Sequence, residues 1–351
     1  MGSALDARAH ERSGAGEVRL ALASPRWRIL LLALGFVSLV LGIAGGLARL
    51  TPAVRAPAGA IALHGALMVS AFLGTVISLE RAVALDRLWA YAAPLCAGIG
   101  GVLILAGFAV PGFALLVFAA GTFVVASTVI LRRQVSLETG TLLAGGATWL
   151  TGNVVLYAGG APVGWWIAFF VLTIGAERLE LSRYLKRTPF SRRAFVALAA
   201  AVVLSSLDAS LRLQGAVLVL FAAWFLRYDL ARVTVRQKGL PRFVAVCLLA
   251  GYFWLTVAGM IFALRGPWDA ALHAVFLGFV FSMIFGHAPV ILPAVLRVRF
   301  PYSPVLYLPL TILHASVALR TGYSILLGAW GNAAAIAVFI VTAAALVLRK
   351  S

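Results

Sequence analysis

Charge and cysteine are both scarce in this sequence. Asp, Glu, Lys and Arg together make up 11% of the 351 residues, whereas 63% are hydrophobic. A soluble protein of this length carries far more charge on its surface. The two cysteines, Cys96 and Cys247, have no CxxC spacing, which argues against a disulfide framework or a zinc knuckle. We interpret both as buried apolar residues.

The motifs of common soluble enzymes are missing as well. The sequence contains no P-loop, no Rossmann glycine fingerprint and no nucleophile elbow, and each of these carries the chemistry of a large enzyme class. No stretch of polar composition is long enough for a soluble domain. What remains is an all-α polytopic integral membrane protein whose main partner is the lipid bilayer.

Apolar runs of membrane-spanning length fill most of the chain. A bilayer core needs about 20 apolar residues per helix, and division at charges, glycines and prolines predicts about twelve transmembrane helices. Their predicted ranges are 27–49, 60–82, 88–110, 112–131, 139–158, 161–180, 193–210, 214–231, 240–264, 268–295, 303–320 and 325–348. We predict one transmembrane domain over residues 27–351, preceded by a disordered cytoplasmic tail over residues 1–26.

Basic residues are divided unevenly between alternate loops. Of the 29 Lys and Arg residues, 24 fall in the tail and in every second loop, and 5 fall in the opposite loops. Because basic residues prefer the cytoplasmic side, this division predicts cytoplasmic N and C termini in a bacterial inner membrane. The five residues on the predicted outer side are Arg49, Arg55, Arg212, Arg265 and Arg320. Topology and anionic lipids then explain the formal charge of +18 without a nucleic-acid partner.

Three of the five histidines lie in apolar segments near the predicted outer face. His64 is a few residues into the second predicted helix, His273 is five residues past Trp268, and His314 is six residues before Arg320. At ~1.5 Å per residue, all three lie roughly 6–9 Å from the helix ends. An intramembrane histidine is costly and is often a ligand. The common depth predicts a haem or metal site, and the alternative for each histidine is a hydrogen bond to a neighbouring helix.

His64 and His273 form the more favourable pair for the two axial ligands of a b-type haem. Small residues leave room for a flat macrocycle, although ordinary close helix packing gives the same pattern. These residues are Gly65, Gly74, Gly140, Gly145, Gly146, Gly152, Gly278 and Gly286. Met68 lies one turn after His64 and is a candidate ligand for copper or an alternative axial haem ligand, against the more usual role of a packing residue. Arg49, Arg55 and Arg265 are candidates for binding haem propionates, and the role of His314 stays open.

A second group of polar residues is expected near the cytoplasmic face. His287 follows His273 by 14 residues, so at ~1.5 Å per residue the two lie ~21 Å apart and cannot bind one ion. Close to His287 in depth are Glu80, Arg81, Glu177 and Arg178. They predict either a proton uptake route or a structural network of ion pairs.

One further polar residue lies inside a predicted membrane helix. Asn153 is expected to bond to Thr148 or Thr151 on neighbouring turns of the fifth helix.

The number of helices and the histidine positions resemble the catalytic subunit of haem–copper oxidases. In that family the second and tenth helices hold the low-spin haem, so the resemblance assigns axial roles to His64 and His273. The family takes copper ligands from its sixth and seventh helices, and the segments WWIAFFVLTIGAERLELSRY and RAFVALAAAVVLSSLDAS contain no histidine. This departure argues against oxygen reduction.

The pattern of His273-Ala274, Gly278 and Gly286-His287 also resembles the NnrS family. These are twelve-helix bacterial membrane proteins that bind haem and copper and are associated with nitric oxide and denitrification. The resemblance covers the helix count and short motifs in the second and tenth helices, with a shorter spacing to the Gly-His element here. It implies a small diatomic gas and a redox partner as interacting molecules.

Two classes of function follow from these patterns. The first is a haem- or metal-binding inner-membrane protein for electron transfer or nitric oxide chemistry, with the question of an enzyme left open. The second is a proton-coupled twelve-helix transporter of the major facilitator kind or a His-lined metal permease. A transporter places polar groups near the midplane, whereas here they gather near both faces, which favours the first class.

Overall fold

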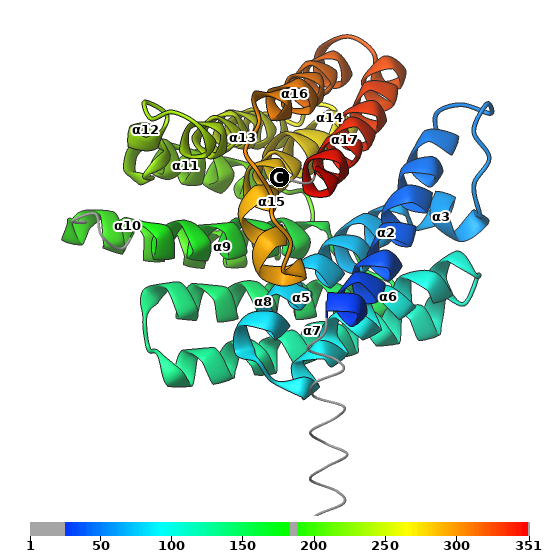
Figure 1. Ribbon diagram of the computed structural model, residues 1–351, viewed down its shortest axis with the longest axis horizontal. Coiled ribbons are helices and arrows are strands. Elements are labelled where there is room, and N and C mark those ends of the chain that lie inside the picture. The colour runs from blue at the N-terminus through cyan, green and yellow to red at the C-terminus, as the bar shows by residue number, and fades with distance from the viewer. Residues whose placement is uncertain (1–24, 183–187, 350–351) are drawn as a thin grey trace, which may run out of the picture.

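The structure is a computed structural model that describes residues 25–182 and 188–349. Helices make up nearly all of these residues, and they contain no strand (Figure 1). Most of the predicted tail, residues 1–24, lies outside the described residues. The last two residues of the predicted tail, 25 and 26, already belong to the first described helix.

Each sequence-predicted range coincides with a helical segment. In chain order the elements are α2 (Pro25–Ala48), α3 (Ala58–Ala62), α4 (His64–Ala66), η1 (Leu67–Leu73), α5 (Gly74–Leu85), η2 (Leu88–Tyr91), α6 (Ala92–Leu105), α7 (Ala109–Arg133), α8 (Leu137–Tyr157), α9 (Val163–Leu181), α10 (Pro189–Ser205), α11 (Arg212–Tyr228), α12 (Ala231–Thr234), α13 (Leu240–Ala263), α14 (Trp268–His273), η3 (Ala274–Phe281), α15 (Ser282–Leu296), η4 (Pro304–Leu306), α16 (Tyr307–Gly322) and α17 (Ile325–Leu348).

Within the described residues, 8 helical segments are long and apolar enough to cross a membrane. The predicted segments outside this set are α8 to α11. Helices α10 and α11 have 17 residues each, and α8 and α9 contain more polar or charged residues. These helices therefore support a multi-pass membrane protein. They do not by themselves show the four further crossings that the sequence predicts.

Helices α8 and α10 begin at side-chain caps that the sequence supplies. Ser136 accepts a hydrogen bond from the backbone N–H of Thr139, and the Thr139 side chain bonds back to the N–H of Ser136, which forms a capping box for α8. Thr188 caps α10 and is followed directly by Pro189 at the first helical position. The predicted range 193–210 therefore begins too late, because its start was set at the basic residues instead of at this cap.

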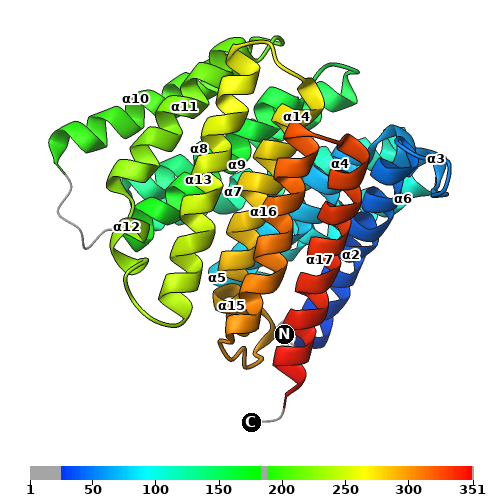
Figure 2. The same cartoon turned by 90° about the horizontal axis from the view of Figure 1, so that it is seen from above.

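Three runs of neighbouring helices surround the middle of the bundle (Figures 1 and 2). Helices α6 to α9 form one run, α10, α11, α13 and α15 the second, and α16, α17 and α2 the third, which continues into α5 through η1. The candidate spans His64–Leu85 and Trp268–Leu296 are 67% and 61% buried, against 33–50% for the other candidate spans. These two segments therefore lie at the centre, beside the largely buried α9.

Both central segments change helical type just inside their first turn. The π-helix η1 begins three residues after His64, and the π-helix η3 begins directly after His273. Such π-helical turns are rare in proteins overall, and those that occur are often found at functional sites. Phe72 at the end of η1 and Phe281 at the end of η3 stack on each other with ring centroids 6.2 Å apart. Helix α15 then continues through Pro289 and Pro293 to Leu296.

A polar network fixes α8 against its neighbours. Asn153 accepts hydrogen bonds from Ser70 Oγ at 2.7 Å and Trp166 Nε1 at 3.1 Å, and its Nδ2 donates to the carbonyl of Leu116 at 3.0 Å. The expected partners Thr148 and Thr151 instead bond to carbonyls of their own helix. That expectation was wrong because the Asn153 side chain faces other helices, which is a property of tertiary packing.

The two ends of the described chain lie at one end of the bundle (Figure 2). Arg28 near the start of α2 donates to the carbonyl of Val295 near the end of α15 at 2.9 Å. Val347 near the end of α17 lines the same cavity as Leu296. The termini thus share one end with His287, which lines that cavity too, whereas the membrane side of this end stays a prediction.

Candidate functional site

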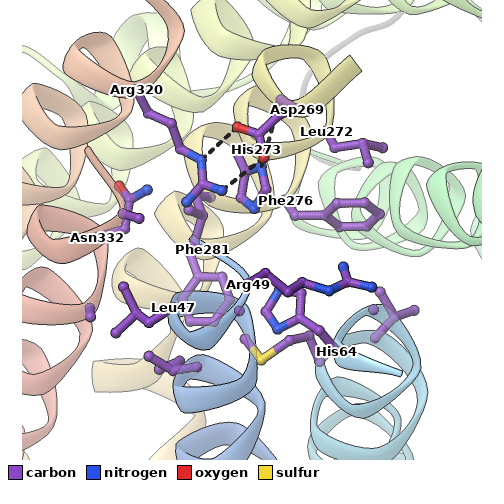
Figure 3. Close-up of a pocket in the computed structure, with 18 of the residues that line it drawn as sticks. Leu47, Arg49, His64, Asp269, Leu272, His273, Phe276, Phe281, Arg320 and Asn332 are labelled. Atoms are coloured by element: carbon purple, nitrogen blue, oxygen red, sulfur yellow. Dashed lines mark hydrogen bonds and ion pairs between the residues drawn. The ribbon is translucent and has the colours of Figure 1, made fainter. Parts of the chain in front are cut away.

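The central segments enclose a cavity of about 380 Å³ at the end of the bundle opposite the termini. His64 and His273 both line it and project from different helices (Figure 3). Its size lies within the range of roughly 300–1,000 Å³ that is usual for ligand and cofactor pockets. The structure thus brings together the two histidines that the sequence predicted as a pair. We call this space the outer cavity.

His64 is oriented by the neighbouring helix α2. Its Nδ1 lies 2.6 Å from the carbonyl oxygen of Gly42, and since a carbonyl only accepts, Nδ1 carries the proton. Nε2 is then the unprotonated nitrogen and can bind a metal. Gly46 leaves space for the ring, because a Cβ at that position would lie 2.8 Å from His64 Cε1.

His273 is oriented by groups of its own helix. Its Nδ1 lies 2.8 Å from the Asp269 carbonyl oxygen and 3.2 Å from Asp269 Oδ1. Both are acceptors, so this ring also carries its proton on Nδ1 and keeps Nε2 unprotonated. Arg320 donates to both carboxylate oxygens of Asp269, at 2.8 and 2.9 Å, and holds it in place (Figure 3). A carboxylate behind a histidine ligand is the usual support of a metal-binding imidazole.

Polar side chains around the outer cavity are suited to binding the negatively charged edge of a ligand. Arg49 lines the cavity, is exposed and lies beside His64 (Figure 3). Asn332 is 4% exposed, and its Nδ2 has no hydrogen-bond partner among the described residues, although Ser316 donates to its Oδ1. A buried donor without a partner is costly, so this amide is available to a bound group. Arg55 and Arg265 are not among the residues that line the cavity.

His314 lies elsewhere. Trp254 Nε1 donates to its Nδ1 at 3.0 Å, and its Nε2 lies 3.3 Å from Ser282 Oγ. Ser282 comes nine residues after His273 on the same central segment, so His314 lies deeper in the bundle than His273. It does not line the outer cavity, and its two bonds match the alternative of a histidine held by a neighbouring helix.

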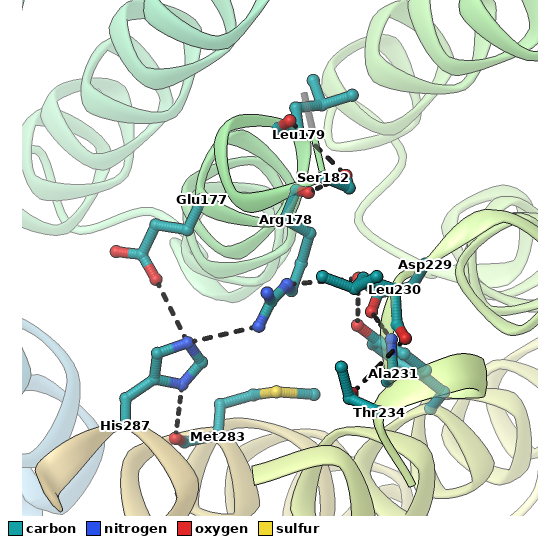
Figure 4. A network of polar contacts seen from close by, with 11 residues as sticks. Glu177, Arg178, Leu179, Ser182, Asp229, Leu230, Ala231, Thr234, Met283 and His287 are labelled. Atoms are coloured by element: carbon teal, nitrogen blue, oxygen red, sulfur yellow. Dashed lines mark hydrogen bonds and ion pairs between the residues drawn. The ribbon is translucent and has the colours of Figure 1, made fainter. Parts of the chain in front are cut away.

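The residues predicted near the other face form a connected network (Figure 4). His287 Nε2 lies 3.5 Å from Arg178 Nη1 and 3.9 Å from Glu177 Oε2. Arg81 pairs with Glu177 at 3.3 Å, and Arg178 pairs with Asp229 at 3.1 Å. Glu80 lines the same cavity as Glu177 and His287. The expected juxtaposition is therefore present.

Several site residues were missed by the sequence reasoning. Asp269 precedes His273 by four residues, a spacing that places both on one helix face, so this signal was available. Asp229 joins the inner network and accepts a hydrogen bond from Tyr252 at 3.1 Å, but it comes from a loop after α11. Asn332 likewise reaches the outer cavity, and the carbonyl of Gly42 reaches His64, through packing alone. No local sequence pattern could have found these three.

The described residues contain no group of three or more His, Cys, Asp or Glu side chains that could hold a metal ion. A bare ion would thus have two histidines in the outer cavity and, if it is a soft metal such as copper, Met68. A haem needs only two axial ligands, because the macrocycle supplies the other four.

The fold and the site together define a polytopic helical membrane protein with paired histidines in a cavity between its central helices. The chain belongs to the family described as a domain of unknown function, DUF8744, whose model matches residues 28–348. No curated protein and no solved structure matches it.

Proposed function

We propose that this protein is a haem-binding redox protein of a bacterial inner membrane, with His64 and His273 as the axial ligands of one haem. The observation that carries the proposal is that both rings donate Nδ1–H to fixed acceptors and line one cavity with Nε2 unprotonated. Two imidazoles on facing helices with this tautomer are the ligand set of a low-spin haem.

The polar edge of the cavity supports the same ligand. A b-type haem carries two propionates, and Arg49 and the Asn332 amide offer a charge and a hydrogen bond to them. Covalent attachment is not expected, because Cys96 and Cys247 lack the CxxCH spacing of a c-type haem.

The residues around the proposed haem would have distinct roles. His64 and His273 hold the iron, and when bound the haem supplies one-electron redox chemistry. Asp269 keeps the His273 ring in one tautomer and increases its basicity through the Nδ1 hydrogen bond. Leu47, Phe276 and Phe281 line the cavity and would keep water from the bound group.

Electron transfer is the role that this ligand set favours. Two axial histidines leave no open position for a gas, so nitric oxide chemistry of the kind implied by the NnrS resemblance requires one histidine to leave. Copper remains a further candidate through Met68, which lines the outer cavity as well. The cytoplasmic position of both termini and all twelve crossings are part of the proposal.

A reduced-minus-oxidised optical spectrum of protein purified after haem-replete expression tests this function. Wild type should give a sharp low-spin signal, and His64→Ala and His273→Ala should each lose it. His314→Gln keeps a hydrogen-bonding side chain next to Trp254 and serves as the matched control, with the signal unchanged. A colourless wild-type protein, or a signal that survives both alanine variants, would contradict the proposal.

A transporter is the second candidate, and one observation favours it. Cavities at both ends of the bundle approach each other at the ring pair of Phe72 and Phe281, an arrangement that alternating access could use. A colourless protein that accumulates protons or divalent metal ions in vesicles, and that loses this activity in Glu177→Gln, would establish this alternative.

A further inference from the structure

A second cavity lies on the other side of the Phe72 and Phe281 ring pair. It has a volume of about 360 Å³ and is lined by α2, α5, α9, α15 and α17. We call it the inner cavity. Its wall is apolar apart from Thr173 and three titratable side chains, Glu80, Glu177 and His287. The proposed haem site makes no use of it.

The titratable groups of the inner cavity are held ready to accept protons. His287 Nδ1 donates to the Met283 carbonyl at 2.8 Å, which leaves Nε2 unprotonated (Figure 4). Glu177 has Arg81 on Oε1 at 3.3 Å and His287 beyond Oε2 at 3.9 Å. Glu80 makes no hydrogen bond or ion pair with any described residue. The inner cavity thus offers one imidazole and two carboxylates as bases.

The fixed positive charges nearby are already neutralised by carboxylates. Arg81 pairs with Glu177, and Arg178 pairs with Asp229. Neither guanidinium lines the inner cavity. A phosphate or another anionic group would therefore meet carboxylates there, and the cavity suits a neutral apolar molecule with a hydroxyl group at one end.

The inner cavity also opens at the exposed surface of the helix bundle. Ala344 on α17 lines it and is exposed, and Leu32 on α2 lines it from the neighbouring helix. A lipid-soluble molecule could place its head near His287 and leave its tail along α17.

We propose that the inner cavity binds a membrane hydroquinone, one hydroxyl group of which faces Glu177 and His287. This inference rests on the proposed haem site, because it names the electron donor of that site. The one haem of a protein molecule would take one electron from each hydroquinone. The hydroxyl O–H bond that breaks gives its proton to His287 Nε2 or to a carboxylate of Glu80 or Glu177, and the hydroquinone leaves as a semiquinone. Two such semiquinones disproportionate to one quinone and one hydroquinone.

The ring pair lies between the two sites. Phe72 lines the inner cavity and Phe281 lines the outer cavity, and their planes are inclined by 27°. Electrons can cross such a thin apolar contact, whereas protons need a chain of polar groups. The protons therefore stay with the carboxylates at the inner end.

The first test measures binding and does not depend on haem. Full-length protein in lipid nanodiscs is titrated calorimetrically with a short-chain hydroquinone, and saturable binding to wild type is expected. Glu177→Gln and His287→Gln should each weaken binding at least tenfold. Ala344→Trp should also abolish binding, because it blocks the surface opening without removing a charge or a core side chain. Glu138→Gln at the start of α8 is the matched control and should bind like wild type.

The second test uses haem-loaded protein and records the rate of haem reduction after addition of the hydroquinone. Reduction should be fast in wild type and slow in Ala344→Trp, with the haem spectrum itself unchanged. Equal binding by wild type and all variants would mean that the probe only partitions into lipid, and would overturn the inference. Hydroquinone binding by a colourless protein would overturn the haem site alone, whereas a haem protein without saturable binding would overturn the inner site alone.

Discussion

The contact between His64 and Gly46 makes the outer cavity sensitive to one methyl group. An added Cβ at Gly46 would lie 2.8 Å from Cε1 and 3.0 Å from Nδ1 of the ring, so the ring must rotate or shift. Since Nδ1 is bonded to Gly42 at 2.6 Å, a shift also breaks the bond that fixes the tautomer. Gly46 thus controls the direction of Nε2.

We expect Gly46→Ala to weaken haem binding about tenfold or more, as for the loss of other groups that orient a metal ligand. Haem titration of the purified protein measures this. Gly121→Ala is the matched control, because a Cβ at that position meets no atom within 4 Å, and its haem affinity should equal that of wild type. Equal affinities for all three proteins would mean that the His64 ring does not bind the iron.

The Asp269 carboxylate should set the reduction potential of the bound haem. Its hydrogen bond to His273 Nδ1 increases electron donation from the ring and stabilises the ferric state. We therefore expect Asp269→Asn to raise the midpoint potential in a spectroelectrochemical titration. Asp208→Asn, in the loop between α10 and α11, is the control with no expected change. A lowered or unchanged potential in Asp269→Asn would contradict this role.

At this scale the sequence was informative about the two histidines of the outer cavity and poor about the groups that orient them. His64 and His273 could be predicted because histidine is costly in an apolar helix. Arg320 was recognised as an outer-side residue, but its pairing with Asp269 joins two helices. His314 was grouped with the pair on equal distance from the helix ends, and that distance does not show that it faces Trp254 and Ser282.

At the scale of single elements, the π-helix η3 fits closely against α13. A Cβ at Gly278 in η3 would lie 2.4 Å from Trp254 Cγ. Trp254 is 7% exposed and donates to His314. It therefore cannot move without losing that hydrogen bond.

We expect Gly278→Ala to lower the free energy of unfolding by about 1–3 kcal/mol, the usual cost of overpacking a core. Gly121→Ala should leave the free energy of unfolding unchanged or raise it by up to about 1 kcal/mol, because alanine has a higher helix propensity than glycine. Denaturant unfolding in detergent, followed by circular dichroism, measures both. A Gly278→Ala protein as stable as wild type would mean that η3 and α13 are packed less closely than described.

The elements themselves could be largely predicted from apolar run lengths. The range 325–348 equals α17 (Ile325–Leu348), and 240–264 ends one residue past α13 (Leu240–Ala263). The change to π-helix after His64 and His273 was not predicted, since the segments LHGALMVSAF and LHAVFLGFVF contain no proline and their hydrophobic pattern is continuous. Both segments nevertheless begin with Leu-His followed by a small residue.

At the scale of the whole molecule, the number of crossings depends on α8 to α11. If all four cross, the loop with Leu207 lies outside and the loop with Val135 lies inside, as the basic residues predict. Leu207 is 71% exposed and Val135 is 87% exposed, so a cysteine at either position is accessible to a reagent.

We expect Leu207→Cys to react with a membrane-impermeant maleimide in intact cells, and Val135→Cys to react only after the membrane is opened. Both are placed in a background of Cys96→Ala and Cys247→Ala, which by itself should stay unlabelled. Labelling of Leu207→Cys only in opened membranes would contradict the twelve-crossing topology.

The arrangement of the helices around the centre could not be predicted. Run length and charge give the order and direction of helices but not their neighbours. The bond from Arg28 to the Val295 carbonyl joins positions 267 residues apart, and the Phe72 and Phe281 rings meet across a similar separation. Such contacts depend on which faces of the helices meet.

The ring pair has an electrical consequence. His64 and His273 lie on one side of the rings, and Glu80, Glu177 and His287 lie on the other, so a charge that passes between these groups crosses part of the transmembrane voltage. A unit charge that crosses the whole membrane gains or loses about 2.3 kcal/mol per 100 mV, and passage across the rings takes a share of this energy. With the inner cavity on the cytoplasmic side, an inside-negative voltage accelerates an electron outward through Phe72 and Phe281 and holds protons at Glu80 and Glu177. The proposed electron transfer from the inner to the outer cavity would therefore be driven by the membrane voltage as well as by the difference in reduction potential.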